Sequence, residues 1–136
     1  MDFALSTTLH TSFGNAVDIT RAALSEQGFG VLTEIDMRAT LKAKIDHDME
    51  DYLILGACNP GLAQRAVDID RRIGLLLPCN VVVRTETGDN NTVVVEAMNP
   101  NLLVQVTGEQ ALGAVADDAT ARLRAAIGSL PHRTDT

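Results

Sequence analysis

The sequence predicts an α+β domain in which a mostly antiparallel sheet of about five strands packs in two layers against helices. Apolar residues alternate with polar ones in some segments and recur at helical spacing in others, which are the periods of strands and of amphipathic helices. Two β-branched runs, 81–83 and 92–96, flank a polar turn cluster, as in a hairpin. The elements follow the order βαβαβαββα. Packing the helices on the sheet in two layers buries the apolar faces of both the helices and the sheet.

The first part of the chain alternates strands with helices. Residues 3–9 have the period of a half-buried strand, and Ser12 is the expected N-cap of a helix that continues to Gly28. Residues 29–35 are rich in β-forming residues and bounded by glycine, which indicates a second strand. Asp36 is then the expected cap of a short second helix, with apolar and basic residues on opposite faces.

The middle of the chain begins with an acidic connection. The charged run 46–51 is unfavourable to bury, whereas residues 52–57 are a largely apolar strand with both faces covered or nearly so. Asn59 and Pro60 are the expected N-cap and first residue of a third helix, because proline lacks an N–H that the first turn leaves unpaired. Gly74 is expected to end this helix. Its predicted buried stripe is Leu62, Ala63, Ala66, Val67 and Ile69.

The last part contains the hairpin and the longest helix. Residues 75–77 are expected to be buried, and Pro78 marks the start of a strand or an edge position. Thr107 and Gln110 form the pattern of a capping box that opens the final helix, and Gly128 ends it. The predicted buried stripe of this helix is Leu112, Val115, Ala119, Leu123, Ala126 and Ile127.

Length and composition limit the class of protein. A chain of 136 residues predicts a single α+β domain over residues 1–136, with a loose polar tail at 131–136. The net charge of −7, from 18 acidic and 11 basic residues, disfavours a nucleic acid or an anionic membrane as partner. Three Phe, one Tyr and no Trp leave no platform for stacking bases. No segment approaches the roughly 18 consecutive apolar residues of a spanning helix, and no signal peptide is evident, so a cytoplasmic protein is expected.

Both cysteines stand next to asparagine, in the pairs Cys58-Asn59 and Cys79-Asn80, and these four residues are the candidate ligand-binding site. Two cysteines make neither a disulfide framework nor a four-ligand zinc site, so free thiols are expected and no metal or cofactor is predicted. Cys58 lies where a strand meets a helix, whose amides would favour its thiolate form. The alternative is that Cys58 is only a small buried residue that packs where the strand meets the helix. For Cys79, at the start of a strand, such a purely structural role is favoured more strongly. Capping is the alternative for Asn59.

The direction of the strands decides whether the two thiols meet. If the strands on either side of the third helix are parallel, Cys58 and Cys79 lie at opposite ends, about 17–20 Å apart. A disulfide requires Cα atoms within about 7 Å, so the parallel arrangement excludes one. If the strands are antiparallel, residues 74–78 carry the chain back and the thiols can meet. The sequence leaves both arrangements open.

Four segments, residues 28–36, 54–60, 74–83 and 93–97, are together similar to a known family. In this order and spacing they resemble the domain-of-unknown-function family numbered 302, and the likeness extends over residues 12–127. The resemblance implies a compact α+β domain with helices against a curved sheet, found as a dimer. It implies no activity.

No catalytic constellation is visible in the sequence. His10, His47 and His132 are scattered, and neither cysteine has a base beside it. We therefore expect a non-enzymatic, homodimeric binding or assembly module that holds a small-molecule ligand near the two Cys-Asn pairs. The alternative is a thiol-dependent redox or soft-metal-binding protein that uses Cys58 and Cys79.

Overall fold

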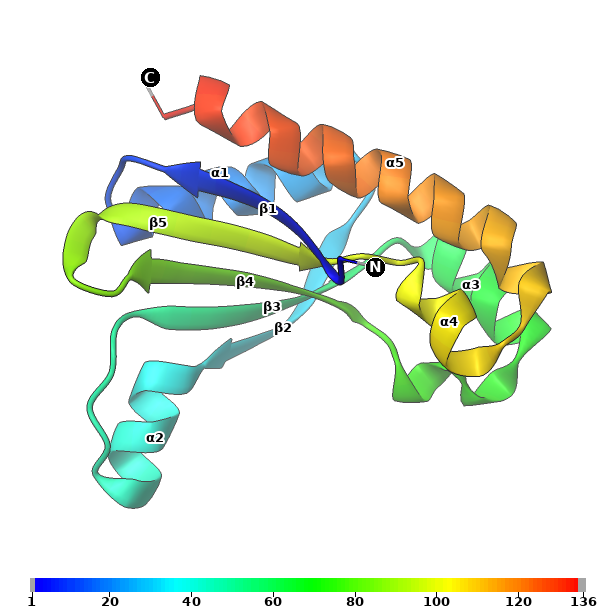
Figure 1. Ribbon diagram of the computed structural model, residues 1–136, viewed down its shortest axis with the longest axis horizontal. Helices are drawn as coiled ribbons and strands as arrows, with labels where there is room; N and C mark the ends of the chain where they lie inside the picture. The colour runs from blue at the N-terminus through cyan, green and yellow to red at the C-terminus, as the bar shows by residue number, and fades with distance from the viewer. Residues whose placement is uncertain (1, 135–136) are drawn as a thin grey trace.

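The computed structural model describes residues 2–134 and contains a five-stranded sheet in the order β1-β5-β4-β3-β2 (Figure 1). Every neighbouring pair of strands is antiparallel, which confirms the predicted α+β class and the antiparallel sheet. The strands are β1 (Ala4–Leu9), β2 (Gly30–Asp36), β3 (Tyr52–Cys58), β4 (Cys79–Glu86) and β5 (Asp89–Met98).

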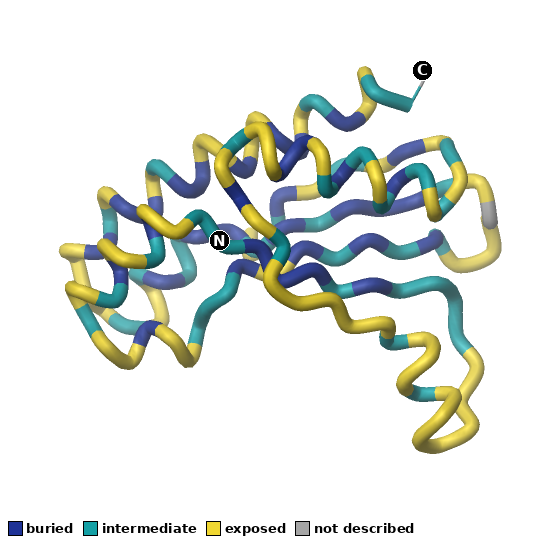
Figure 2. The backbone as a smooth tube through the Cα atoms, turned by 180° about the vertical axis from the view of Figure 1, so that it is seen from behind, coloured by how far each residue is buried: buried dark blue, intermediate teal, exposed yellow. Residues whose placement is uncertain are grey.

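Two long helices pack against one face of the sheet, and the remaining helices lie at its ends (Figures 1 and 2). None of the helices within residues 2–134 is long and apolar enough to cross a membrane. The α-helices are α1 (Phe13–Glu26), α2 (Met37–Ile45), α3 (Pro60–Ile69), α4 (Leu102–Thr107) and α5 (Gly113–Ser129). Three short 3-10 helices are η1 (Arg71–Leu75), η2 (Gln110–Leu112) and η3 (Leu130–His132).

Three of the predicted helix caps are confirmed. The side chains of Ser12, Asp36 and Asn59 each accept the backbone N–H three residues further along, at the starts of α1, α2 and α3. This bond satisfies one of the amides that a helix start leaves without a partner. The caps fix where each helix leaves the strand before it.

The main hydrophobic cluster lies between the sheet and the helices α1 and α5. Alternate residues of every strand except β2 are buried there, because period-2 side chains point to one face. The strand residues of this cluster are Leu5, Leu9, Leu53, Leu55, Ala57, Val81, Val83, Val93, Val95 and Ala97. On the other face of the sheet Tyr52, Ile54 and Val82 are half-buried, so β3 is covered fully on one face and partly on the other.

A second hydrophobic cluster lies beyond the end of the sheet, where α3, η1, α4 and η2 form what we call the lobe (Figure 1). The first half of α5 contributes Val115 and Ala119 to this cluster, and its second half contributes Leu123, Ala126 and Ile127 to the main one. The whole predicted stripe of α5 is thus confirmed as buried. One helix spans both clusters.

Helix α2 and the connection to β3 project from the body, and together with the edge strand β2 they form what we call the arm, residues 30–51 (Figures 1 and 2). Helix α2 has no buried residue, and β2 is an edge strand paired only with β3 on one side. The register between β2 and β3 shifts between Val31 and Thr33, so Leu32 is an extra residue in a β-bulge. The arm is therefore the least packed part of the described chain.

The third helix ends earlier than the sequence predicts. It stops at Ile69, where Asp70 caps η1 by accepting the N–H of Arg72, so Gly74 lies inside a 3-10 turn and does not end α3. Leu75 closes that turn and is 86% exposed, which contradicts its predicted burial. The carboxylate of Asp70 competes for the backbone and starts a tighter turn before glycine is reached.

The start of the last helix is also different. Thr107 is the last residue of α4, where its hydroxyl donates to the carbonyl of Leu103, and α5 begins six residues later at Gly113. The predicted capping box is therefore wrong, and α4 was not predicted. Gly128 lies within α5, which continues to Ser129. Of the predicted loose tail, residues 135 and 136 lie outside the described residues, while Leu130–His132 forms η3.

Replacing Leu123 with alanine tests the phase of α5. Leu123 is fully buried in the main cluster, so its truncation should lower the free energy of unfolding by about 2–5 kcal/mol through lost transfer energy and a cavity. Its neighbour Arg122 is exposed and pairs with Asp118 at 2.8 Å, so Arg122→Ala should change stability by less than about 1 kcal/mol. Urea unfolding of both variants at one protein concentration measures the contrast. A larger loss from Arg122→Ala would contradict the packing described here.

Candidate functional site

The antiparallel pairing of β3 and β4 brings the two cysteines to the same end of the sheet. Ala57 is the direct partner of Cys79, and Cys58 is the next residue along β3. Of the two arrangements that the sequence leaves open, the structure has the one in which the thiols can meet. The cysteines are free, with Cys58 half-buried and Cys79 buried.

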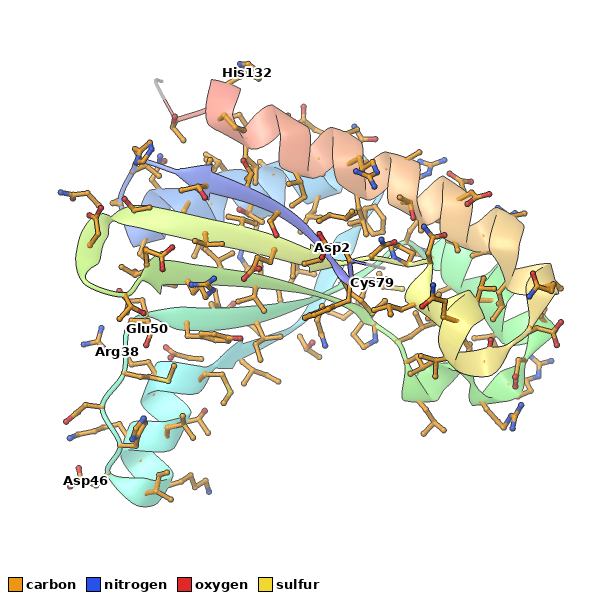
Figure 3. The ribbon with its side chains drawn as sticks, viewed as in Figure 1. Asp2, Arg38, Asp46, Glu50, Cys79 and His132 are labelled. Carbon is orange, nitrogen blue, oxygen red and sulfur yellow. The ribbon has the colours of Figure 1, made fainter. Side chains whose placement is uncertain are left out.

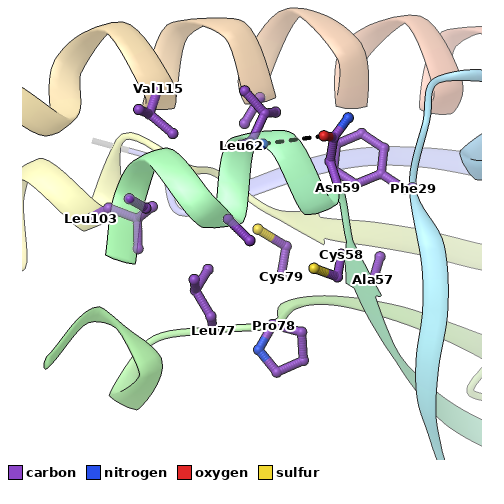
Figure 4. Close-up of a pocket in the computed structure, with 13 residues that line it drawn as sticks. Phe29, Ala57, Cys58, Asn59, Leu62, Leu77, Pro78, Cys79, Leu103 and Val115 are labelled. Carbon is purple, nitrogen blue, oxygen red and sulfur yellow. Dashed lines mark hydrogen bonds between the residues drawn. The ribbon is translucent and has the colours of Figure 1, made fainter. Parts of the chain in front are cut away.

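Both cysteines line an apolar cavity of about 40 Å³ (Figure 4). The cavity lies where the two hydrophobic clusters meet, with Phe29 and Ala57 from the main cluster and Leu62, Ala66 and Val115 from the second cluster. A water molecule needs at least about 10–15 Å³ of such space, so the cavity has room for only a few atoms. It is a small, apolar site with two cysteines in its wall.

Asn59 connects this cavity to helix α3. Its Oδ1 accepts the N–H of Leu62 at 3.2 Å, which confirms the capping interpretation (Figure 4). Its side-chain amide also lies against Gly28, where a Cβ would be only 2.9 Å from Nδ2 and where φ is +84°. Both the contact and the backbone angle favour glycine at that position. The amide of Asn59 is therefore held by the fold at the rim of the cavity.

The thiol of Cys79 is held in its neutral form. Burial is the main cause that raises its pKa to about 11, and the neighbouring Cys58 adds to the effect. A thiol with this pKa is almost entirely protonated near neutral pH, and only the thiolate is a good nucleophile. Cys79 is thus a poor first nucleophile, whereas Cys58 is the more accessible of the two sulfurs.

The fourth candidate residue lies elsewhere. Asn80 is exposed and faces a shallow groove on the other side of the sheet, lined also by Phe3, Tyr52 and Val82. The structure therefore brings Cys58, Asn59 and Cys79 together at one cavity and separates Asn80 from them. Adjacent residues of a strand point to opposite faces, so the side chains of Cys79 and Asn80 lie on opposite sides of the sheet.

The histidines and acidic clusters do not join the cavity. Figure 3 shows His132 near the C-terminal end and Asp46 at the tip of the arm, both far from Cys79. Within residues 2–134 no three His, Cys, Asp or Glu side chains gather to hold a metal ion. Other walls of the cavity, Leu77, Pro78 and Leu103, were not predicted as site residues, because isolated apolar residues give no signal of a cavity.

An open antiparallel sheet, covered on one face by two helices and ending in a thiol-lined cavity, defines a small α+β domain. The chain belongs to the family described as Domain of unknown function DUF302, whose sequence model matches residues 5–130. This confirms the resemblance noted in the sequence.

A solved structure shares the fold. It is described as the crystal structure of uncharacterized conserved protein DUF302 from Bacillus stearothermophilus, and it is similar with a TM-score of 0.86 and 28% sequence identity. The match covers 94% of this chain and 98% of that one. No curated protein matches this sequence.

The raised pKa of Cys79 predicts a loss of stability at alkaline pH. The folded protein holds the Cys79 proton up to about pH 11, whereas the unfolded thiol releases it near pH 9.0. Between these values ionisation stabilises only the unfolded state, so the free energy of unfolding falls as the pH rises. The stabilisation is complete below about pH 9 and is lost toward pH 11. The loss amounts to roughly 2–3 kcal/mol, at 1.36 kcal/mol per pKa unit.

The measurement is urea unfolding from pH 8 to 11 of the wild type and of Cys79→Ala. Other groups titrate equally in both proteins, so the difference between the two curves isolates Cys79. We expect the stability advantage of the wild type to fall across this range. A constant difference would show that Cys79 ionises normally in the folded protein.

Proposed function

We propose that this protein is a cytoplasmic, homodimeric assembly module that binds a small ligand in the thiol cavity and that catalyses no reaction. The observation that carries the proposal is the arm, which is folded but almost unpacked. Isolated helices shorter than about 12–15 residues are marginal in water, and α2 has nine residues with none buried. A second copy of the chain supplies the missing contacts.

The ends of α2 are well formed, so its lack of burial is not a sign of a weak helix. Asp36 Oδ1 accepts the N–H of Ala39 at 2.8 Å at the N-terminus. At the C-terminus Asp46 adopts the left-handed conformation with φ 54°, and the N–H of His47 reaches the carbonyl of Leu41. The N–H of Asp46 also reaches the carbonyl of Lys42 at 3.1 Å, which is the bond of an αL cap. The sequence specifies a helix here although the body of the protein does not cover it.

Two basic residues of α2 pair with carboxylates of the arm, while several apolar side chains of the arm remain exposed. Arg38 pairs with Asp51 at 2.8 Å, and Lys42 lies 2.8 Å from Asp46. By contrast Leu32 is 67% exposed and Ile45 is 68% exposed. Exposed apolar groups surrounded by satisfied charges are typical of an interface between proteins.

The sheet face beside the arm extends this apolar surface. Ile35 pairs with Ile54, and Ile54 pairs with Val82, so the three side chains form one row across β2, β3 and β4. This row lies on the face away from the main cluster. Two copies related by a two-fold axis would bring the same patch of each together, as in most homodimers.

A pair of matched leucine variants tests the dimer. Leu32→Arg places a charge in the proposed interface, while Leu75→Arg makes the same change at an exposed leucine of the lobe. In size-exclusion chromatography with light scattering, the wild type and Leu75→Arg should be dimers and Leu32→Arg a monomer. A monomeric wild type at high micromolar concentration would contradict the dimer. A dimeric Leu32→Arg would contradict its placement on the arm.

A thiol-dependent function is the second candidate, and the shared cavity of Cys58 and Cys79 favours it. Soft thiolate ligands select Cu(I), and the two sulfurs would be the protein ligands of such an ion. The apolar walls leave little room for water beside it. The same cavity would then hold a metal ion in place of a small molecule of only a few atoms.

Competition titration tests this candidate. Under reducing, oxygen-free conditions the wild type should take one Cu(I) per chain from a weaker chelator. Cys58→Ala and Cys79→Ala should each lose that binding, because one thiolate remains. Equal binding by the wild type and both variants would contradict a site built from the two thiols.

A further inference from the structure

The polypeptide crosses between the sheet and the lobe at the two cysteines. It leaves β3 at Cys58 to enter α3, and it returns from η1 into β4 at Cys79. Both residues line the cavity between the two hydrophobic clusters, as Figure 4 shows. We propose that Cys58 and Cys79 form a reversible intramolecular disulfide that fastens together the ends of β3 and β4, where the chain leaves the sheet for the lobe and returns from it.

The strand register brings the Cα atoms of the two residues close together, and the shared cavity brings both residues to one site. Cys58 is the last residue of β3, where the chain turns into α3 and the strand alternation ends. Direct partners in an antiparallel pair have Cα atoms about 4.5–5.5 Å apart, and one step along a strand adds about 3.4 Å at a right angle. Because Ala57 is the direct partner of Cys79, the Cα atoms of Cys58 and Cys79 are roughly 6 Å apart. Disulfides span about 4.4–6.8 Å between Cα atoms.

The two sulfurs have different surroundings, which sets the order of the chemistry. Cys58 is half-buried and meets a reagent first, while Cys79 is buried and its pKa is raised by that burial. The oxidant is a low-molecular-weight disulfide. The Cys58 thiol gives its proton to solvent, and its sulfur attacks one sulfur of the reagent, whose S–S bond breaks and releases one thiol after protonation.

The second step closes the bridge. Cys79 releases its proton to solvent and attacks the Cys58 sulfur, so the mixed disulfide breaks and a second reagent thiol leaves with a proton. In total two cysteine thiols are oxidised and one reagent disulfide is reduced to two thiols. Since Cys79 ionises only at high pH, this second step is slow near neutrality and becomes faster as the pH rises.

The bridge would close a loop that contains α3 and η1. It forms from residues that already lie together, so it restricts the unfolded chain more than it changes the folded one. Disulfides in the cytoplasm are usually transient and redox-sensing, which fits one accessible and one protected thiol. The inference rests on the shared thiol cavity of the second candidate function and is independent of dimerisation.

The test uses the purified full-length protein, oxidised glutathione as the reagent and a chelator to exclude metal ions. The intact wild type should lose the mass of two hydrogens, and a peptide map should join Cys58 to Cys79. Excess dithiothreitol should reverse both changes. The oxidised protein should have a Tm higher by an amount on the order of 5–10 °C.

Single variants separate the two steps. Cys79→Ala should stop at a stable glutathione adduct on Cys58, and Cys58→Ala should remain unmodified while folded, which circular dichroism verifies. A wild type that ends with that adduct, forms a disulfide between chains or retains two free thiols would overturn the proposal. An unchanged Tm in the bridged protein would overturn the fastening role. Light scattering of the same samples measures dimerisation separately. If the wild type fails to bind Cu(I), the mass measurement still tests the disulfide, so the two proposals can fail independently.

Discussion

The apolar stripe of α5 is the contact on which the two halves of the molecule depend. Its second half buries Leu123, Ala126 and Ile127 against the sheet, while its first half buries Val115 and Ala119 against α3 and α4. The sheet alone could not hold the lobe, because the other connections between them are short backbone crossings. A single rigid helix sets the distance between the two clusters and so the size of the cavity that lies where they meet.

Most of the fold follows from local patterns in the sequence. The strands were predictable because one face of the sheet is buried and the other is not, which leaves a period of two. The caps at Ser12, Asp36 and Asn59 were predictable because their side chains act on amides three residues away. Helix α4 was missed because it has six residues and shows no helical repeat. The exposure of Leu75 was missed because leucine has the same chemistry whichever way a turn directs it.

The candidate site depended on a fact that local patterns do not contain. Cys58 and Cys79 are separated by a helix and a turn that could return the chain in either direction, so their proximity is a property of the topology. The role of Asn59 at the start of α3 was predictable from the proline that follows it. The separation of Asn80 follows from its place on β4, one residue beyond Cys79. The cavity itself is formed by packing between distant segments, which no local signal predicts.

The bulge at Leu32 has a consequence for how an exposed sheet edge is kept from uncontrolled growth. A flat, unpaired edge strand offers its free amides and carbonyls to any other strand, and repeated edge pairing leads to fibres. In β2 the extra residue interrupts the regular spacing of these groups, and the attached α2 projects beside them. Bulges twist an edge away from extended pairing. The bulge therefore makes repeated edge-to-edge pairing along β2 unfavourable.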